Sequence, residues 1–406
     1  MSFSATEGSM SRAAAAAHIA VRPRRSRSDL LCLEDFAVRA RRRLPRMLYG
    51  FVAGGAESGA SLRNNRASFE RCTLVPRVLI DTRARTQATA LFGRTYAAPF
   101  GIAPLGAAAL CAYRADIELA RAAASADIPM ILSASSLIPL EQVRQAGALW
   151  YQAYLPGDAA RIEALVARVA AAGFETLVLT ADVPVAANRE NNLRNGFSLP
   201  VVPGPRLCWQ ALTHPRWLFG TALRTLLRHG MPRFENMDAG RGAPILSRNL
   251  VRELGQRDGL TWEHLRLMRR LWPGKLVVKG ILSPADAQLA RDCGADGIIV
   301  SNHGGRQLDG AASPMEVLPA IAAHKAGLTV MLDGAIRRGT DVLKALALGA
   351  DFVFLGRPFL YAATLGGAPM VAEAARLLCE EIHRDMALLG INRLAELGPQ
   401  HVLRGP

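Results

Sequence analysis

The feature of this sequence that most constrains its fold is a rhythm of short apolar runs, each of which ends in polar residues or glycine. Runs of this length, rich in Val, Ile, Leu and Phe, predict strands that are buried on both faces of a sheet. Eight of them recur along the chain, at residues 100–104, 130–133, 150–154, 176–182, 276–280, 297–302, 329–334 and 352–357.

Helical periodicity fills most of the intervals between these runs. The predicted helices cover residues 115–126, 140–146, 159–172, 262–271, 284–293, 314–324 and 340–348 and, before the first strand, residues 34–43 and a segment that begins at Pro45. Because parallel strands need a crossover connection, strands that alternate with helices predict a parallel sheet. Eight such strands predict an α/β fold, a (β/α)8 TIM barrel with an N-terminal helical segment.

Polar and ionisable residues stand at six consecutive strand ends. Barrels of this type place their chemistry at the carboxyl ends of the strands. From the third strand to the eighth, the residues are Gln152 with Tyr154, Thr180 with Asp182, Lys279, His303, Asp333 and Arg357. So many polar side chains at one end of a barrel predict an active site rather than an accident of core composition.

The most informative single stretch is GIIVSNHGGRQLDG, residues 297–310. A buried strand leads into Ser301, Asn302 and His303, and two glycines then allow a sharp turn before Arg306. Arginine holds a carboxylate through two parallel hydrogen bonds, and neutral histidine accepts a proton near neutral pH. The pair therefore predicts a substrate that carries a carboxylate and loses a proton. The alternative is a structural turn with a solvated histidine and arginine.

The last two strand ends have the features of an anion site. DGAIRRG at residues 333–339 and LGRP at residues 355–358 set glycine backbone beside Arg337 and Arg357. Such barrels commonly hold a phosphate after the seventh and eighth strands, so the two loops together predict a phosphorylated cofactor. Lys279 follows a buried run of valines, where a snorkelling lysine would fit. Its place at the barrel mouth favours instead a fixed positive charge, of the kind that a flavin would need near its pyrimidine ring if it became a reduced anion.

One interval breaks the rhythm, because about 90 residues separate the fourth strand from the fifth, far more than a connection of this kind needs. We predict an insert at about residues 195–258. Its segment 207–232 mixes Trp, Leu and Phe with arginine, a composition typical of an interfacial membrane segment. A lid over the active site or a subunit contact is the alternative. The remaining divisions are a disordered basic tail at 1–28, the barrel domain at 29–394 and a C-terminal tail at 395–406.

The chain has 406 residues and a formal net charge of +15, much of it from arginines at residues 22–46. Such a surface could attract anionic lipid, nucleic acid or acidic substrates. Nucleic acid is the weakest of these, since the sequence has no zinc finger, aromatic RNA-binding or helix-turn-helix pattern. Six cysteines without a CxxC pair predict a reduced, cytosolic protein with no metal site. We expect neither a membrane-spanning segment nor a secretory signal.

Four motifs together resemble those of a known family, the FMN-dependent 2-hydroxy acid dehydrogenases and oxidases. The motifs are SNHGGRQLDG, LVVKGI, DGAIRRGTDVLKALALGA and LPRMLYGFVAGGAE, and the likeness extends from about Leu44 to Leu394. The insert, with LTHPRW and LRHGMP, resembles the membrane-associated branch of (S)-mandelate and L-lactate dehydrogenases. The resemblance implies oxidation of an (S)-2-hydroxy acid, mandelate-like or lactate, to the 2-oxo acid, with electrons passed to a membrane quinone or another carrier.

The resemblance also implies roles for individual residues. His303 would take the proton of the substrate hydroxyl, with Asp182 supporting its charged form, while the α-hydrogen leaves as hydride to N5 of the flavin. Arg306 and Arg189 would hold the carboxylate, and Tyr154 would hydrogen-bond the substrate. The residues expected to bind FMN are Pro104, Leu105, Gly106, Ser133, Gln152, Tyr154, Thr180, Lys279, Ser301, Asp333, Gly334, Ala335, Ile336, Arg337, Gly356 and Arg357. Relatives imply a homotetramer in the cytoplasm, with peripheral contact to the inner face of the cell membrane through residues 207–232.

Three positions distinguish this chain within the family pattern. Phe51 stands in the substrate pocket where many members have a tyrosine that reaches the carboxylate, and loss of that hydrogen bond would weaken binding by roughly 1.5 to 3 kcal/mol. Ser135 replaces a tryptophan of glycolate oxidase, so the pocket differs in shape. Gly106 is typical of mandelate dehydrogenases, whereas oxidases tend to have alanine. We therefore expect a dehydrogenase; the alternatives are an oxygen-using oxidase that releases hydrogen peroxide and a catalytically silent flavin-binding barrel.

Overall fold

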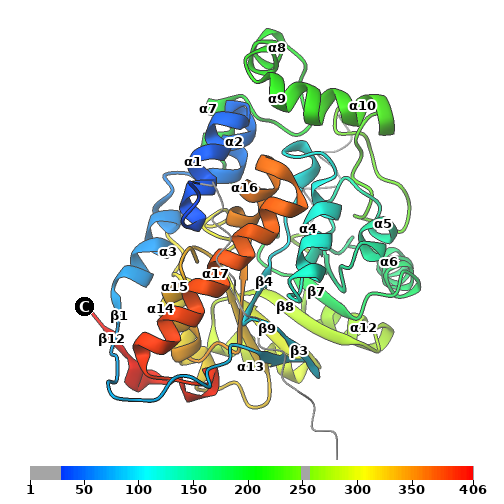
Figure 1. The fold of residues 1–406 in the computed structure, drawn as a ribbon. Coiled ribbons are helices and arrows are strands. Elements are labelled where there is room, and N and C mark those ends of the chain that lie inside the picture. The colour runs from blue at the N-terminus through cyan, green and yellow to red at the C-terminus, as the bar shows by residue number, and fades with distance from the viewer. Residues whose placement is uncertain (1–28, 248–256, 406) are drawn as a thin grey trace, which may run out of the picture.

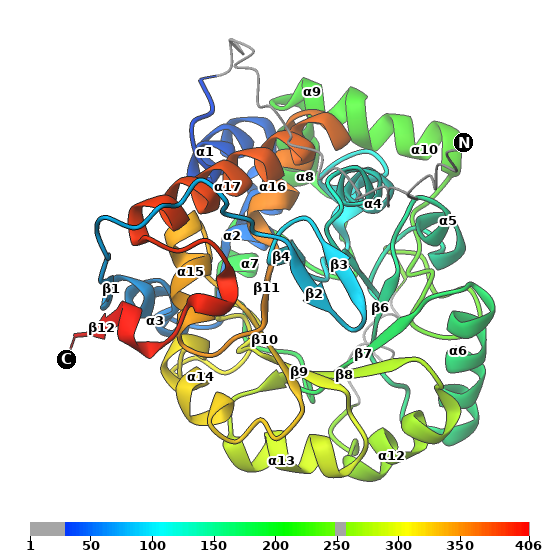
Figure 2. The same ribbon diagram turned by 60° about the horizontal axis from the view of Figure 1, so that its bottom comes forward.

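The eight predicted strands form one parallel barrel (Figure 2). The computed structural model describes residues 29–247 and 257–405, so the tail predicted at 1–28 and part of the insert lie outside the described residues. The strand order is β4-β11-β10-β9-β8-β7-β6-β5, and a parallel bridge between Ile102 and Met130 joins β4 to β5. The strands are β4 (Phe100–Ile102), β5 (Ile131–Ser133), β6 (Trp150–Ala153), β7 (Thr176–Thr180), β8 (Lys275–Ile281), β9 (Gly297–Val300), β10 (Thr329–Asp333) and β11 (Phe352–Leu355). The (β/α)8 barrel predicted from the sequence is confirmed.

Helices cover the outside of the barrel (Figure 2). In chain order they are α4 (Ala115–Ser125), α5 (Leu140–Gln145), α6 (Ala159–Ala171), α12 (Trp262–Leu271), α13 (Pro284–Asp292), α14 (Pro314–Ala322), α15 (Gly339–Ala347) and α17 (Ala368–Leu389). All seven helices predicted between strands are present, with ends within two residues of the prediction. A further helix, α16 (Arg357–Gly366), directly follows β11 and packs against α17.

Helix α6 illustrates why these segments are helical. It begins after Asp158, whose side chain accepts a hydrogen bond from the Arg161 amide at 3.0 Å and so caps the first turn. Ile162, Leu165 and Val169 then recur at helical spacing and are buried. The apolar face therefore packs against the barrel while the opposite face remains in solvent.

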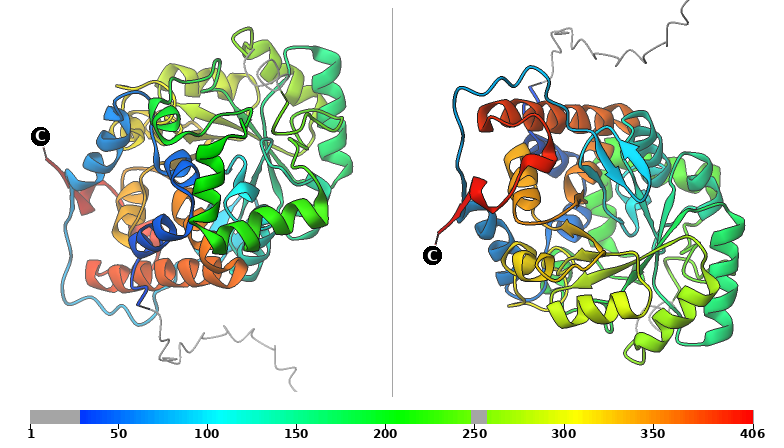
Figure 3. Two further views of the ribbon diagram at one scale, coloured as in Figure 1. Left: turned by 90° about the horizontal axis from the view of Figure 1, so that it is seen from above. Right: turned by 90° about the horizontal axis from the view of Figure 1, so that it is seen from below.

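A short hairpin closes the lower end of the barrel. β2 (Thr89–Leu91) and β3 (Arg94–Tyr96) lie across the amino ends of the strands (Figures 2 and 3). Phe92 in the turn packs against Trp150 with ring centroids 5.5 Å apart, and Tyr96 packs against Phe352 at 6.1 Å. The alternation of strands and helices did not predict this hairpin. Because the inward-facing side chains here are large and apolar, the lower half of the barrel is a packed core.

The N-terminal and C-terminal segments pack on the outside and on the mouth of the barrel. α1 (Leu33–Arg43) and α2 (Arg46–Ala53) are the two helices predicted before the first strand, and α3 (Ala60–Glu70) follows them. The segment predicted as a C-terminal tail returns to the barrel, since β12 (Val402–Arg404) pairs antiparallel with β1 (Cys72–Leu74). This pairing joins residues more than 300 positions apart, which no local pattern in the sequence indicates.

The insert after β7 stands above the barrel mouth. α7 (Glu190–Asn195), α8 (Pro205–Leu212), α9 (Pro215–Trp217), a π-helical stretch (Leu218–Leu223) and α10 (Arg224–His229) occupy the top of Figure 1 and lie along the rim in Figure 3. Gln210 and Trp217 anchor it: Oε1 of Gln210 accepts from the Met47 amide at 2.8 Å, and the Trp217 indole donates to the Leu110 carbonyl at 2.8 Å. None of the helices that the structure describes is long and apolar enough to cross a membrane.

Candidate active site

His303 lies in the loop after β9 with its backbone in the left-handed region, at φ +57°. Histidine adopts this conformation more readily than most residues. The Ser301 hydroxyl holds the turn by accepting a hydrogen bond from the His303 amide at 3.0 Å. Nδ1 of His303 lies 2.9 Å from Oδ1 of Asp182, which follows β7. A carboxylate beside Nδ1 favours the tautomer with its proton there, so that Nε2 can accept a proton.

A buried lysine holds this end of the site together. Nζ of Lys279 donates to Oγ of Ser301 at 2.8 Å and lies 3.2 Å from Asp333 and 3.8 Å from Asp182. Burial disfavours the charged lysine, but Asp333 and Asp182 outweigh burial and raise the pKa of Lys279. Gly280 follows at φ +103°, and a Cβ there would lie 2.5 Å from Cβ of Asp182. Only glycine therefore permits this approach of β8 to the carboxylate.

The protonation states of His303 and Asp182 follow from burial and from each other. Burial lowers the pKa of His303; the Asp182 carboxylate opposes this shift, and Lys279 adds to it. Burial also opposes ionisation of Asp182, but His303 and Lys279 outweigh it, so the pKa of Asp182 lies below its usual range. Near neutral pH the pair is thus a neutral imidazole beside a carboxylate. Such a pair can take a proton and stabilise the resulting imidazolium.

Two half-buried arginines face the same cavity as His303. Nη1 of Arg306 donates to the carbonyls of Phe51 at 2.7 Å and Gly54 at 3.0 Å, where α2 ends. Nε of Arg189 donates to the backbone carbonyl of Arg306 at 3.1 Å. Burial lowers the pKa of both guanidiniums, and Arg189 lowers that of Arg306 further. Since the carbonyls fix these side chains but carry no net charge, a carboxylate entering the cavity meets two oriented cations.

The strand ends open into a cavity of about 590 Å³. Three polar atoms of its wall are buried without a hydrogen-bond partner in the described part of the chain: Nε2 of Gln152, Oγ1 of Thr180 and Oδ1 of Asp333. The Ser133 hydroxyl donates to Oε1 of Gln152 at 3.0 Å, which leaves the amide nitrogen for a ligand. Unpaired buried polar atoms are unfavourable, so these three mark where the donors and acceptors of a bound ring would lie.

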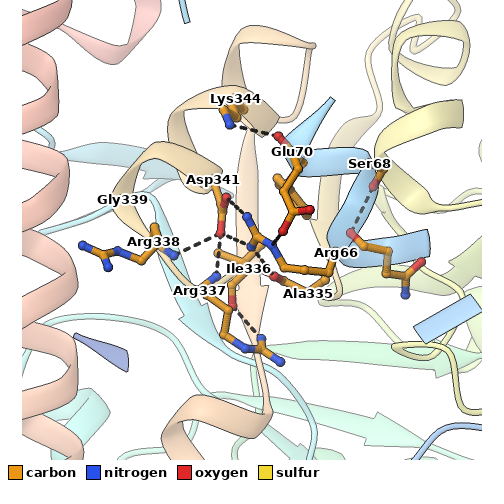
Figure 4. A network of polar contacts seen from close by, with 12 residues as sticks. Arg66, Ser68, Glu70, Ala335, Ile336, Arg337, Arg338, Gly339, Asp341 and Lys344 are labelled. Atoms are coloured by element: carbon orange, nitrogen blue, oxygen red, sulfur yellow. Dashed lines mark hydrogen bonds and ion pairs between the residues drawn. The ribbon is translucent and has the colours of Figure 1, made fainter. Parts of the chain in front are cut away.

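The loop after β10 is shaped by a buried carboxylate on α15 (Figure 4). Asp341 accepts hydrogen bonds from the amides of Arg337 at 2.9 Å and Arg338 at 3.1 Å, and from the Arg66 guanidinium at 2.6 and 2.9 Å. Ala335 in this loop has φ +57°, a conformation that residues other than glycine rarely adopt. The network holds the backbone of residues 334–337 against the cavity, where it could bind an anion.

Arg357 links three segments at the barrel mouth. Its Nε donates to the Val52 carbonyl at 2.9 Å, and its Nη2 donates to the carbonyls of Gly54 and Gly304, each at 3.0 Å. Burial, with the neighbouring Arg337, lowers the pKa of Arg357 to about 10. The side chain therefore positions the loop that carries His303 while it contributes positive charge to the cavity.

The structure brings nearly all of the predicted site residues together. Phe51, Tyr154, Arg189, His303 and Arg306 line the cavity, and so does every residue predicted to bind FMN except Ser301. The Ser301 hydroxyl instead supports Lys279 and the His303 amide, and Asp182 contacts Nδ1 of His303.

Sequence reasoning missed residues that reach the cavity from the insert. Phe197 stacks on Phe51 with ring centroids 4.4 Å apart, and Phe234 also lines the cavity. The guanidinium of Arg257 lies over the Tyr154 ring, 4.3 Å from its centroid. Arg66 and Asp341, which shape the loop after β10, were missed as well. None of these residues directly follows a strand, so their positions in the sequence do not indicate that they reach the cavity. Only the aromatic residues of the insert could have suggested that it contributes to the site.

Comparisons with known proteins agree with this site. A family model described as FMN-dependent dehydrogenase matches residues 40–404. L-lactate dehydrogenase of Chromohalobacter salexigens is 39% identical over 377 residues, 91% of this chain and 95% of that protein. (S)-Mandelate dehydrogenase of Pseudomonas putida is 38% identical over 376 residues, 92% of this chain and 94% of that protein.

Solved structures give the same result. The crystal structure of the monotopic membrane protein (S)-mandelate dehydrogenase matches with a TM-score of 0.85 and 36% identity, over 93% of this chain and 100% of that one. A mandelate oxidase matches with a TM-score of 0.77 and 33% identity, over 93% of this chain and 99% of that one. Fold and site thus define the class as flavin-dependent oxidoreductases of the (β/α)8 type. The chain belongs to the FMN-dependent dehydrogenase family, as its motifs predicted, and it is an enzyme that acts on the CH–OH group of 2-hydroxy acids.

The residues present fit FMN. Gln152, Thr180 and Asp333 offer the unpaired donors and acceptors that the polar edge of a flavin ring requires. The raised pKa of Lys279 keeps a positive charge beside them, opposed by burial but sustained by Asp333 and Asp182. Arg337 and Arg357, with the backbone of residues 334–337, supply the cations and amides that suit a phosphate.

Proposed function

We propose that this enzyme oxidises an (S)-2-hydroxy acid to the corresponding 2-oxo acid. The observation that carries the proposal is the convergence in one cavity of a histidine beside a carboxylate, two oriented arginines and the polar atoms that suit FMN. A 2-hydroxy acid needs these groups together, because its carboxylate must be held while its hydroxyl loses a proton and its α-carbon loses a hydride.

In the proposed reaction, Arg306 and Arg189 bind the substrate carboxylate and so orient the hydroxyl toward His303. Nε2 of His303 takes the hydroxyl proton, and Asp182, 2.9 Å from Nδ1, stabilises the imidazolium that forms. The Tyr154 phenol stays protonated, because burial raises its pKa, and it donates a hydrogen bond to the substrate. When bound, FMN would supply the hydride acceptor that oxidation at the α-carbon requires.

Residues from most strand ends would hold the cofactor. Lys279, Gln152, Thr180 and Asp333 would bind the pyrimidine edge of the ring, with Ser133 supporting Gln152. Pro104 to Gly106 would line the other wall, and the loops that carry Arg337 and Arg357 would bind the phosphate. Lys279 would supply there the fixed positive charge that favours a reduced, anionic ring.

The side chain of the substrate meets a wall of mostly apolar residues. Phe51 and Phe197 form a stacked pair, and Leu199 and Phe234 line the cavity beside them. An aromatic or medium-sized side chain would bury apolar surface there. We therefore place mandelate-like acids before lactate, and the (S)-mandelate dehydrogenase of Pseudomonas putida supports this choice.

We propose that the insert binds a membrane surface and that electrons pass to a quinone there. Trp209, Phe219 and Leu227 are 68%, 66% and 85% exposed, and arginines alternate with them. Exposed aromatic and aliphatic side chains next to cations are typical of interfacial helices. The neighbour described as a monotopic membrane protein supports the same placement. Such contact would put the protein at the cytoplasmic face of the membrane.

The test of the oxidation is anaerobic reduction of the FMN-loaded enzyme by a panel of 2-hydroxy acids in both enantiomers. We expect one (S)-acid to bleach the flavin absorbance and its enantiomer not to. Slow recovery of colour in air would support a dehydrogenase, whereas fast recovery with peroxide release would indicate an oxidase. If every acid leaves the absorbance unchanged although FMN is bound, the proposed activity is wrong and the silent barrel is favoured.

The test of the membrane contact is sedimentation with anionic and neutral lipid vesicles. We expect the wild type to sediment with anionic vesicles and a Trp209→Ser, Phe219→Ser, Leu227→Ser variant to remain in the supernatant with its flavin reduction intact. Leu79→Ser with Leu388→Ser is the matched control, since both residues are exposed but lie outside the insert. Equal sedimentation of all three proteins would argue for a lid or subunit contact instead.

A further inference from the structure

Gln307 lies in the loop after β9, directly after Arg306, and lines the same cavity. This loop is anchored on both sides of Gln307. Nη1 of Arg306 donates to the Phe51 carbonyl at 2.7 Å, and Oδ1 of Asp309 accepts a hydrogen bond from the Ser61 amide at 2.8 Å. The backbone that carries Gln307 is therefore held in place, so its side chain starts from a defined position.

The side-chain amide of Gln307 joins its own loop to the loop after β7. Its Oε1 accepts a hydrogen bond from Nη2 of Arg189 at 2.9 Å, and its Nε2 donates to the Val185 carbonyl at 3.3 Å. A guanidinium only donates hydrogen bonds and a carbonyl only accepts them. The two partners thus require one acceptor and one donor from the same side chain. Among side chains of this length, only glutamine offers both without carrying a charge.

The two arginines that are proposed to bind the substrate carboxylate are both held by neutral oxygen atoms. Besides Gln307, Arg189 donates to the backbone carbonyl of Arg306 at 3.1 Å, and Arg306 itself donates to carbonyls at the end of α2. Among the residues that the structure describes, no carboxylate forms an ion pair with either guanidinium. An ion pair would compete with a ligand for the same N–H donors. Neutral partners orient the two arginines and leave their charge for the ligand.

We propose that Gln307 is a positioning residue for carboxylate binding, which orients Arg189 through an uncharged acceptor and so keeps that guanidinium available to the substrate. The inference rests on the proposed function, because it assigns a further residue to the same site. A glutamate of the same length would instead pair with Arg189 and occupy it. Since Gln307 acts through Arg189, its substitution should weaken binding of the carboxylate more than it slows the chemical step.

The main test is Gln307→Glu, which keeps the length and the acceptor of the side chain but adds a negative charge. Calorimetric titration of the FMN-loaded protein with phenylglyoxylate and with pyruvate measures carboxylate binding without turnover, and the uncharged 2-oxo amide of each acid is the reference ligand. We expect the wild type to bind at least one acid more tightly than its amide. Gln307→Glu should weaken binding of that acid by about tenfold or more and binding of its amide by less than about threefold.

Gln142→Glu is the matched control. Gln142, on α5, also accepts a hydrogen bond from an arginine, because its Oε1 lies 2.6 Å from Nη2 of Arg114, but it lies outside the cavity. This substitution changes the net charge of the protein equally and should leave both affinities as in the wild type. If it weakens binding of the acid as much as Gln307→Glu does, the effect is one of net charge and the proposal fails.

A second variant, Gln307→Met, removes both hydrogen bonds without adding a charge, and it tests the proposal even if Gln307→Glu does not fold. It should weaken binding of the acid by about three- to tenfold. In an Arg189→Met background it should have no further effect, because it acts through that guanidinium. The proposal is overturned if the wild type binds each acid no more tightly than its amide. It is also overturned if the Gln307 variants bind the acid as the wild type does, or weaken acid and amide equally.

Turnover separates this inference from the proposed reaction. With an (S)-2-hydroxy acid that reduces the flavin, Gln307→Glu should raise KM by about tenfold and change kcat by less than about threefold. If no hydroxy acid reduces the flavin but the binding results are as expected, the reaction is wrong and the role of Gln307 stands. If the flavin is reduced but the substitutions leave both KM and the affinity for the oxo acid unchanged, the reaction stands and the role of Gln307 is wrong.

Discussion

The two ends of the barrel are built from the same eight strands but differ in what their side chains do. At the amino ends, Trp150 and Phe352 pack against Phe354, with ring centroids 5.5 and 5.4 Å from that of Phe354, which itself lines the floor of the cavity. At the carboxyl ends, buried Lys279 lies 3.8 Å from the half-buried Asp182 carboxylate, and polar atoms face a cavity.

This difference indicates that the amino ends of the barrel stabilise the fold and the carboxyl ends carry out the reaction. Buried apolar rings lower the free energy of the folded state through the area that they remove from water. Buried charges at best offset the loss of their hydration, so they are retained for what they do to a ligand. Substitutions at the lower end should therefore change the free energy of unfolding, and substitutions at the mouth should change the reaction.

The largest effect is expected at His303. Asparagine tolerates the left-handed backbone at this position but does not accept the proton, so His303→Asn should slow flavin reduction by about 10² to 10⁴-fold. Stopped-flow absorbance measures the rate, and the flavin spectrum checks that FMN remains bound. A variant that reduces its flavin at the wild-type rate would rule out His303 as the base.

At the other end of the barrel, Phe352→Ala should lower the free energy of unfolding by about 3 to 5 kcal/mol, because it opens a cavity beside Tyr96 and Phe354. Denaturant titration of the FMN-loaded protein measures the loss. Phe219→Ala, at an exposed position, is the control and should stay within about 0.5 kcal/mol of the wild type. A change in substrate preference in Phe352→Ala would contradict the separation of the two ends.

An intermediate effect is expected from Asp182→Asn. The Asp182 carboxylate raises the pKa of His303 against burial, so its removal lowers that pKa further. Because the neutral imidazole is the active form, the acidic limb of the kcat/KM profile should move to lower pH. The plateau should fall by about ten- to a hundredfold, since the imidazolium loses its stabilising partner. A limb that stays in place or moves to higher pH would show that another group titrates.

The smallest effect is expected from Phe51→Tyr. A tyrosine hydroxyl at this position could donate to the substrate carboxylate beside Arg306, whose guanidinium lies 5.2 Å from the centre of the Phe51 ring. We expect KM to fall by about tenfold while kcat changes little. Phe197→Leu serves as a control for altered stacking, and an unchanged KM in Phe51→Tyr would mean that the carboxylate lies out of reach of residue 51.

Much of the site could be predicted because it lies at strand ends. His303, Asp182, Lys279 and Asp333 each follow an apolar run directly, and a parallel barrel brings all such ends to one side. Arg257 and Phe197 follow no strand, so only the path of the insert places them at the cavity. Ser301 shows a different limit: its position was predicted, but its hydroxyl supports Lys279 at 2.8 Å instead of lining the cavity.

The sequence by itself determined the alternation of strands and helices, the side of the barrel that carries chemistry, and the family, because all three are encoded in contiguous residues. Tertiary structure alone decided the hairpin beneath the barrel, the pairing of β1 with β12, and the contact of Arg357 with Val52, which are 305 positions apart. These features depend on which distant segments meet. Local periodicity records how a segment folds, but it does not record which segment it will contact.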